Sequence, residues 1–338
     1  MTLDQYVRKL GANSNTSQLV NVWSKVMHGV ESTQQSAAFF IDYCRRNKGL
    51  LAIRADDHTG GQYLRLPDGK SHISPFTWLR WLTMSFSGAQ SIMKGIAKLL
   101  GHSHIHLSSP VVSIDDLGSY VAVTSANGQC FHGRKCIISI PSTLLRGINI
   151  QPPLPRPVQD MANATKLGDY NKSIVCYDRP WWREQGYNGF FMSYKGYISV
   201  ARDTSVDEKE LYCLTCFMNG EAGAEWSRFP LHQRRKVVLD QIADVFQQEL
   251  DSEAYRPIEI FEQVWKDELY SQGALVPIPA LGHLTGFAAT YGKPVGNIHF
   301  VGTEYASEWK GYMEGALDSG ERGAAEVVSA LGPPRAQL

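Results

Sequence analysis

The sequence predicts an α/β (α+β) fold, in which helices alternate with short strands. Three observations carry this prediction: helical periodicity fills residues 3–50, short apolar strands separated by turns occupy the middle of the chain, and an Ala/Gly-rich helix closes it. The 338 residues suit one large domain or two smaller ones, and 43% hydrophobic with 20% charged residues is an ordinary globular balance.

The N-terminal residues are expected to be helical because apolar side chains recur at helical spacing. They do so in two groups: Leu19, Val20, Val22, Trp23, Val26 and Met27, then Ala37, Phe39, Phe40 and Tyr43. Residues 56–61 are rich in turn formers, and residues 62–66 alternate like a strand. Residues 91–100 form an amphipathic helix that Gly101 ends.

Strand and helix signals continue to the C-terminus. We expect strands at 105–107, 111–114, 121–124 and 136–140, strands of a second sheet at 173–177, 197–201 and 211–218, and a short buried strand at 298–301. An Asn127-Gly128 turn separates two of the early strands. Helices are predicted at 231–250 and 312–331, the last one stopped by Gly332-Pro333-Pro334.

Charge and targeting signals argue against a nucleic-acid-binding, membrane-spanning or secreted protein. Lys+Arg and Asp+Glu are equal at 33 each, which argues against nucleic acid or an anionic membrane as the main partner. No apolar run reaches the roughly 20 residues that a transmembrane helix needs, and the N-terminus lacks a secretory pattern. The six scattered cysteines indicate a reducing compartment, so we expect a cytoplasmic location. The terminal Ala336-Gln337-Leu338 makes the peroxisome the alternative.

Two clusters could carry redox or metal chemistry. Cys213-x-x-Cys216 lies in a predicted buried strand, where residues three apart point to opposite faces, so we interpret both as core cysteines rather than a redox dithiol or half a metal site. His102, His104 and His106 would share one face of a strand, which could bind a metal. No carboxylate or cysteine stands at ligand spacing from them, so we favour a solvated edge and predict no metal site.

The most specific segment runs from Phe300 to Ala325. It contains Gly302-Thr303-Glu304, Gly311-Tyr312-Met313-Glu314-Gly315 and Ser319-Gly320-Glu321-Arg322-Gly323. This segment resembles the C-terminal signature of flavin-containing amine oxidases of the monoamine oxidase type, in which a strand, a turn and a helix start hold the flavin. Glycines allow a flat ring to approach the backbone, and the positive end of a helix favours the negative charge of a reduced flavin.

Other segments resemble the family in the same order along the chain. They are Gly60-Gly61-Gln62, Gln90-Ser91-Ile92, Pro110-Val111, Pro152-Pro153-Leu154-Pro155, Trp265 and Tyr270-Ser271-Gln272-Gly273-Ala274. The resemblance implies FAD bound non-covalently, as in the fungal enzymes, because Ala274 stands where the animal enzymes carry the cysteine bonded to FAD. The cofactor-binding residues that it implies are Val111, Ala274, Gly302, Thr303, Glu304, Gly311, Tyr312 and Met313.

The resemblance also implies a division of the chain. Residues 1–87 would be a helical part of the substrate domain with an atypical insert at 70–87, residues 88–150 the middle of the FAD-binding domain, residues 151–262 the mixed-sheet substrate domain with its helices, residues 263–332 the C-terminal FAD-binding segment, and residues 333–338 a tail. The insert is either a retained intron or a real lid or interaction hairpin.

The activity implied by the resemblance is oxidation of a primary or secondary amine to an imine and then an aldehyde, with O2 reduced to H2O2. Tyr312 would form one wall of an aromatic cage for the amine, Gln62 would donate hydrogen bonds into the pocket, and Trp265 would lie beside the ring. The alternatives are a core position for Trp265 and a strand-surface position for Gln62.

Three departures from the family pattern limit this expectation. No G-x-G-x-x-G occurs, so FAD would lack its pyrophosphate site and bind weakly, and uncovered apolar surface would cause poor solubility or homo-oligomerisation. Ala222 stands where we place the family lysine that holds a water near flavin N5, and Leu275 stands near the second wall of the cage. A pseudo-enzyme without FAD and a non-redox tailoring enzyme are the alternative functions.

Overall fold

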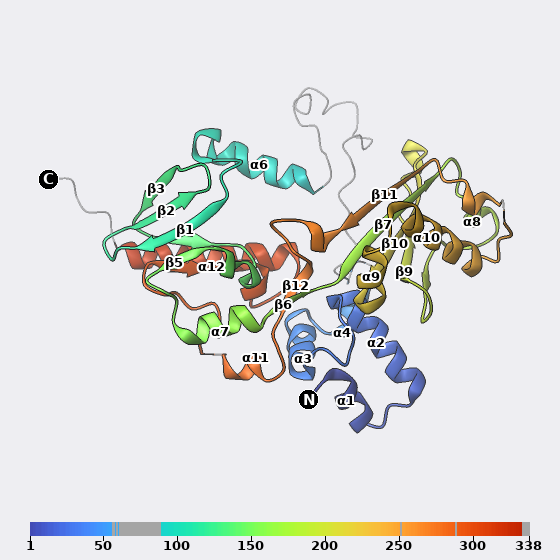
Figure 1. The fold of residues 1–338 in the computed structure, drawn as a ribbon, viewed down its shortest axis with the longest axis horizontal. Coiled ribbons are helices and arrows are strands. Elements are labelled where there is room, and N and C mark those ends of the chain that lie inside the picture. Colours follow the sequence, from blue (N-terminus) through green and yellow to red (C-terminus); the bar gives the residue numbers. More distant parts are fainter. Residues whose placement is uncertain (56–57, 59, 61–88, 251, 288, 333–338) are drawn as a thin grey trace.

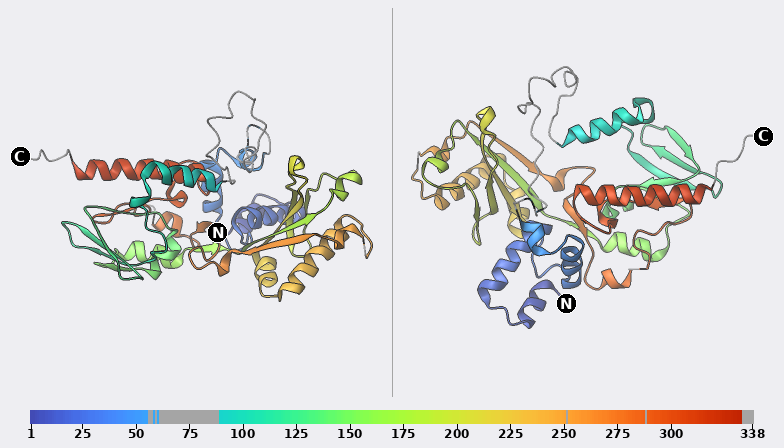
Figure 2. Two further views of the ribbon diagram at one scale, coloured as in Figure 1. Left: turned by 90° about the horizontal axis from the view of Figure 1, so that it is seen from above. Right: turned by 180° about the vertical axis from the view of Figure 1, so that it is seen from behind.

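Two groups of strands, each covered by its own helices, lie side by side in the computed structural model (Figures 1 and 2). The structure describes residues 1–55, 58, 60, 89–250, 252–287 and 289–332. Gln62, the strand predicted at 62–66, the insert at 70–87 and the tail at 333–338 lie outside these residues. No helix in the described ranges is long and apolar enough to cross a bilayer.

Four helices open the chain, as the periodicity predicts. They are α1 (Leu3–Lys9), α2 (Ser14–His28), α3 (Ala37–Arg46) and α4 (Leu50–Arg54). Thr2 and Gln5 form a reciprocal capping box at the start of α1, and the side chain of Asn13 accepts the backbone N–H of Thr16 at the start of α2. Gly29 ends α2 in the left-handed conformation, with φ +68°.

A five-stranded antiparallel sheet forms one half of the molecule. Its strand order is β11 (Glu259–Val264), β7 (Tyr170–Tyr177), β10 (Tyr212–Asn219), β9 (Ile198–Asp203) and β8 (Phe191–Met192). One face packs against α9 (Gly220–Ser227) and α10 (Leu231–Val245), where Trp181, Trp182 and Trp226 are almost completely buried. The strands predicted in this region are confirmed, whereas α10 ends five residues before the predicted Leu250.

The other half holds a four-stranded sheet and a two-stranded parallel ladder. The sheet has the order β3 (Cys130–Gly133), β2 (Val121–Ser125), β1 (Val111–Asp116) and β5 (Asn149–Gln151), and the ladder joins β4 (Cys136–Ile138) to β13 (Ile298–Phe300). The last helix, α12 (Met313–Leu331), lies close to the residue after β13, because a Cβ at Gly323 would approach Val301 Cγ1 to 2.2 Å. The remaining helices here are α6 (Gln90–Leu100), α7 (Arg156–Ala164) and α11 (His283–Gly286).

A short antiparallel ribbon connects the halves, since β6 (Lys166–Gly168) pairs with β12 (Ala274–Ile278) and leads directly into β7. The backbone packs tightly there: a Cβ at Gly168 would lie 1.9 Å from the carbonyl oxygen of His28. Only glycine therefore fits where α2 meets the ribbon.

The strand predicted at 105–107 is wrong. Residues His102–His104 form one turn of 3-10 helix (η1), and no ladder follows until β1. The histidine alternation therefore does not place three rings on one strand face; all three are exposed, and no group of three metal-ligating side chains occurs in the described ranges.

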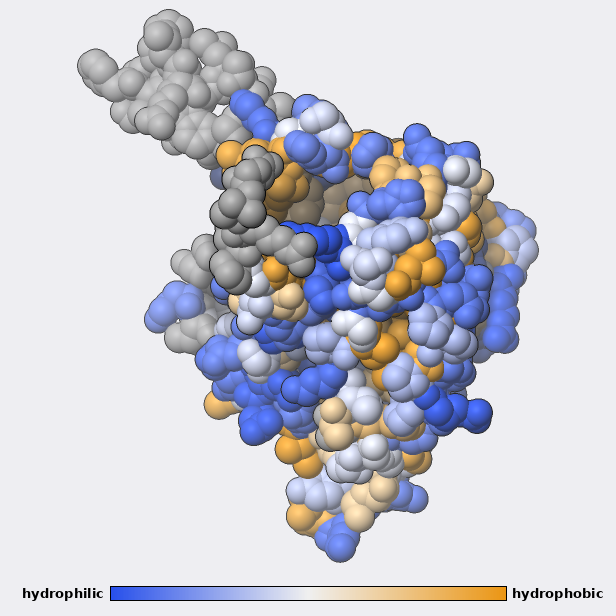
Figure 3. Space-filling model, turned by 90° about the vertical axis from the view of Figure 1, so that its left-hand side faces the viewer, coloured by the Kyte–Doolittle hydropathy of each residue, from blue (hydrophilic) through white to orange (hydrophobic). Residues whose placement is uncertain are grey.

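The predicted helix at 91–100 is confirmed, but its apolar side chains are not buried. Leu99 is 89% exposed, Leu100 is 60% exposed, and α6 contains no buried residue. Leu107 and Val112 add to the exposed apolar surface nearby. Figure 3 shows hydrophobic surface around a hollow on the side of the molecule that carries α6 and β1–β3.

Candidate cofactor and substrate pocket

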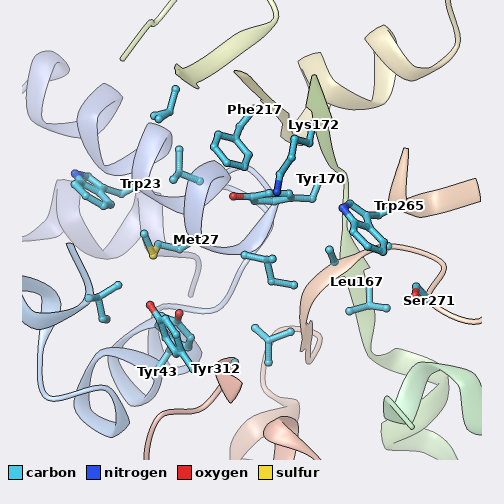
Figure 4. Close-up of a pocket in the computed structure, with 18 of the residues that line it drawn as sticks. Trp23, Met27, Tyr43, Leu167, Tyr170, Lys172, Phe217, Trp265, Ser271 and Tyr312 are labelled. Atoms are coloured by element: carbon cyan, nitrogen blue, oxygen red, sulfur yellow. The ribbon is translucent and has the colours of Figure 1, made fainter. Parts of the chain in front are cut away.

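A cavity of about 700 Å³ lies where the two halves meet, a size typical of small-molecule and cofactor sites (Figure 4). Helices α2 and α3, the strands β7–β10, the ribbon strand β12 and the start of α12 all contribute to its wall. Side chains at its centre are aromatic or aliphatic, so the cavity presents a largely apolar environment with few polar groups. The residues that line it include Tyr43, Tyr170, Lys172, Phe217, Trp265, Ala274, Leu275, Gly311, Tyr312 and Met313.

The start of α12 forms one wall of the cavity. Tyr312 is the N-cap and makes no side-chain cap hydrogen bond, so the first turn of a 19-residue helix keeps backbone N–H groups available beside the cavity. Thr303 Oγ1 accepts the N–H of Gly311 at 2.6 Å and donates to the carbonyl of Tyr312 at 2.9 Å. This pair of hydrogen bonds fixes the backbone of the wall.

Gly311 is required by conformation as well as by space. Its φ is +89°, and a Cβ there would stand 3.3 Å from Tyr43 Cε2. A side chain at this position would be strained and would press on the tyrosine. No side chain therefore projects from the wall at Gly311, and its backbone faces the cavity directly.

Tyrosines and a phenylalanine form two opposing aromatic surfaces. Tyr43 and Tyr312 lie side by side in Figure 4. Burial, and next the neighbouring phenol of Tyr312, raise the pKa of Tyr43 well above its ordinary value, so its hydroxyl stays protonated. Tyr170 packs edge-on against Phe217 with 5.7 Å between ring centroids, and burial likewise raises the pKa of Tyr170.

A lysine side chain reaches into this apolar space. Lys172 Nζ lies 5.4 Å from the centroid of the Phe217 ring, and burial lowers the pKa of Lys172. Ala222, which stands where we placed the family lysine, belongs to α9 and is not among the lining residues, whereas Lys172 on β7 lines the cavity. The strand alternation of Tyr170, Lys172 and Ile174 was the signal that could have found it.

The structure brings several predicted site residues together and separates others. Trp265, Ala274, Gly311, Tyr312 and Met313 line the cavity, as does Leu275, which is 48% exposed. The remaining predicted residues, Val111, Gly302, Thr303 and Glu304, are outside the set that lines it.

Glu304 turns into the interior behind this wall. It accepts the backbone N–H of Ser142 at 2.8 Å, the Ser142 hydroxyl at 2.6 Å and the Tyr291 hydroxyl at 3.0 Å. Burial raises the pKa of Glu304, and these donors oppose that rise. These contacts hold the carboxylate of Glu304 against Ser142 and Tyr291.

Two buried basic groups lie close behind Tyr43. The His28 ring centroid is 4.4 Å from that of Tyr43, and His28 Nδ1 is 2.9 Å from Gln35 Oε1. Burial lowers the pKa of His28 to about 3, so the ring is neutral at physiological pH. Burial also lowers the pKa of Lys310, to about 8, and its ammonium lies over Phe39 and Tyr291.

Known proteins with similar sequences are flavin-containing amine oxidases. A family model described as flavin containing amine oxidoreductase matches residues 7–328. A probable flavin-containing monoamine oxidase A of Dictyostelium discoideum is 31% identical over 98% of this chain and 67% of its own length, and amine oxidase [flavin-containing] B of Sus scrofa is 28% identical over 98% and 60%. The chain thus spans about three-fifths to two-thirds of the length of these relatives.

Solved structures show the same fold. Cyclohexylamine oxidase from Brevibacterium oxydans superimposes with a TM-score of 0.83 at 22% identity, over 98% of this chain and 68% of that one. A putrescine oxidase bound to putrescine superimposes with a TM-score of 0.82 at 20% identity, over 97% and 68%.

Proposed function

The chain belongs to the flavin-containing amine oxidoreductase family, and from this we propose that it oxidises a primary or secondary amine at a bound flavin. The observation that carries the proposal is the apolar cavity in which the start of α12, Tyr312 and Lys172 come together. The flavin would accept the hydride equivalent from the carbon next to nitrogen and be reoxidised by O2, giving H2O2. The imine then hydrolyses to an aldehyde and ammonia or a smaller amine.

The residues present fit the flavin ring. The uncapped start of α12 offers N–H donors and a positive dipole end to an electron-rich ring edge, and Gly311 leaves room for a flat face. We propose non-covalent binding, since Ala274 has no thiol to bond the ring. The sequence has no G-x-G-x-x-G for the pyrophosphate, so we expect weak affinity for FAD.

The pocket residues would bind and orient the amine. The Tyr170–Phe217 pair and Tyr312 offer aromatic surfaces to its apolar part, while Leu275 offers a smaller aliphatic surface. The cation of Lys172 and the apolar surroundings disfavour a protonated amine, so the neutral form is expected to bind. Trp265 closes the wall next to Ala274.

The test is to mix the purified chain with FAD and follow amine-dependent H2O2 formation, using benzylamine and cyclohexylamine as probes. We expect yellow protein and turnover in the unaltered chain, and loss of both in Gly311→Val, whose side chain would project from the pocket wall towards Tyr43. Gly128→Val is the matched control, because Gly128 also has a positive φ, +82°, but nothing within 4 Å of its Cβ position.

Each alternative function has its own outcome in this experiment. A colourless protein that still binds the amines would support a pseudo-enzyme instead. Product formation without flavin or O2 would support a non-redox tailoring enzyme.

We also propose that the chain self-associates through the exposed apolar surface formed by α6 and Leu107. Leu99 is 89% exposed and Leu107 83% exposed, and burying such side chains against a second molecule is favourable. Sedimentation velocity is expected to show oligomers, and Leu99→Glu with Leu107→Glu is expected to shift them to monomer. Leu250→Glu is the control, since Leu250 is 80% exposed in the other half of the molecule. A monomeric unaltered chain would contradict the proposal.

A further inference from the structure

Two thiols face each other across the central strands of the five-stranded sheet. Cys213 on β10 is paired with Cys176 on β7 in the antiparallel register, and their Sγ atoms are 3.3 Å apart. Cys216, the other member of the Cys-x-x-Cys motif, is completely buried and lies on the opposite face of β10. The partner of Cys213 is therefore a residue 37 positions away, which the motif does not reveal.

The backbone hydrogen bonds identify the type of pair. The Cys213 N–H donates to Ser205 Oγ at 3.1 Å and its carbonyl accepts from Thr204 N at 2.9 Å, so both groups point away from β7. The Cys176 carbonyl accepts from Ile258 N at 2.8 Å, on the β11 side, away from β10. The two cysteines thus form a non-hydrogen-bonded pair, in which opposing Cα atoms are about 4.5 Å apart.

This spacing suits a covalent bond. Disulfides join residues whose Cα atoms lie between about 4.4 and 6.8 Å apart, so the pair can be cross-linked without moving the strands. Both side chains are half-buried rather than sealed in the core. Burial raises the pKa of Cys213 to about 12, so Cys213 stays a protonated thiol, which suits it to close the disulfide as the second partner rather than to attack peroxide first.

The pair shares a sheet face with the pocket. Cys176 is four residues beyond Lys172, and Cys213 is four residues before Phe217, so alternation places all four on the same side of the sheet. At about 3.3 Å per residue, the thiols lie about 13 Å along the strands from the pocket side chains.

We propose that Cys176 and Cys213 are a peroxide-responsive dithiol. The thiolate of Cys176 attacks one oxygen of H2O2, the O–O bond breaks, and hydroxide leaves and is protonated to water, so that Cys176 becomes a sulfenic acid. The thiol of Cys213 then attacks the sulfenic sulfur, the S–O bond breaks, a second water leaves, and the S–S bond forms. Two thiols and one H2O2 thus give one disulfide and two H2O, and a small thiol such as glutathione reverses the reaction by exchange. The dithiol is inferred from the positions of the two cysteines on neighbouring strands. The statement that amine oxidation supplies its H2O2 rests on the proposed function.

The bond would clamp the two strands that carry the pocket side chains. It would join β7, with Tyr170 and Lys172, to β10, with Phe217, outside the cavity itself. Cross-linking a loop of this length restricts the unfolded chain, so the thermal midpoint is expected to rise by about 5 °C on oxidation.

The experiment treats the purified chain with excess H2O2, blocks remaining thiols with iodoacetamide and maps the peptides by mass spectrometry. We expect a linked peptide pair containing Cys176 and Cys213 that is two hydrogens lighter, and its disappearance with dithiothreitol. C176S and C213S should each abolish the link and the rise in midpoint, while C130S, at an exposed cysteine on β3, should not. Recovery of both thiols alkylated, or oxidised singly to sulfinic acid, in a chain with unchanged circular dichroism would overturn the proposal.

A second arm replaces H2O2 with FAD, benzylamine and O2, with and without catalase. A link that forms and is suppressed by catalase supports both the dithiol and the amine oxidation. A link formed by added H2O2 but never by the amine supports the dithiol and counts against the oxidase function.

Discussion

Replacing Lys172 with methionine is expected to lower amine-dependent H2O2 formation about 100-fold while leaving bound flavin largely unchanged. Lys172 reaches the cavity beside Phe217 from β7. Among the described residues that line the cavity, it is the only lysine. The family resemblance implies a lysine that holds a water near flavin N5, and we propose that Lys172 takes this role. Removing one preorganised donor from an apolar site costs about 100- to 1000-fold in rate.

Methionine is the suitable replacement because it is similar in length and apolar, so the packing against Phe217 is kept. The rate with saturating benzylamine and the flavin content are measured on the same samples. Lys236→Met serves as the control, since Lys236 is 72% exposed on α10, on the far side of the sheet. An unchanged rate in the Lys172 variant would show that the lysine takes no part in the reaction.

Acid is expected to destabilise the chain through His28, and His28→Gln is expected to remove this sensitivity. The pKa of His28 is about 3 in the folded chain, below the 6.5 of an unperturbed histidine, because the ring is completely buried. The unfolded chain therefore takes up the proton first as the pH falls. The contribution is fully present above pH 6.5 and is lost as the pH falls towards 3, to a total of about 5 kcal/mol, at about 1.4 kcal/mol per pKa unit.

The measurement is the free energy of urea unfolding of both proteins between pH 7 and pH 4, compared as a difference so that other acidic groups cancel. His28→Gln can still reach Gln35 with its amide but carries no titrating proton. His232→Gln, at an exposed position on α10, is the control and should follow the unaltered chain. Parallel pH profiles for the unaltered chain and His28→Gln would contradict the prediction.

Local sequence information was enough for most elements and for the family. Helical periodicity and the end signals Gly101 and Gly332 located the helices, because caps and side-chain spacing act within one or two turns. The signature from Phe300 to Ala325 was recognisable because the residues that carry the resemblance are contiguous in the chain. The strand predicted from local alternation at residues 105–107 was wrong, because no neighbouring strand pairs with this segment.

The amino-acid sequence by itself thus determined most helices and strands, their order along the chain and the family, because these depend on residues that are close to one another in the chain. Only the tertiary structure decided that Lys172 enters the pocket, that Tyr170 and Phe217 oppose Tyr312, and that Glu304 turns inwards. It likewise paired Cys213 with Cys176 rather than with Cys216. These outcomes depend on strand register and on which faces pack together, and residues tens of positions apart must first be brought together before such contacts exist.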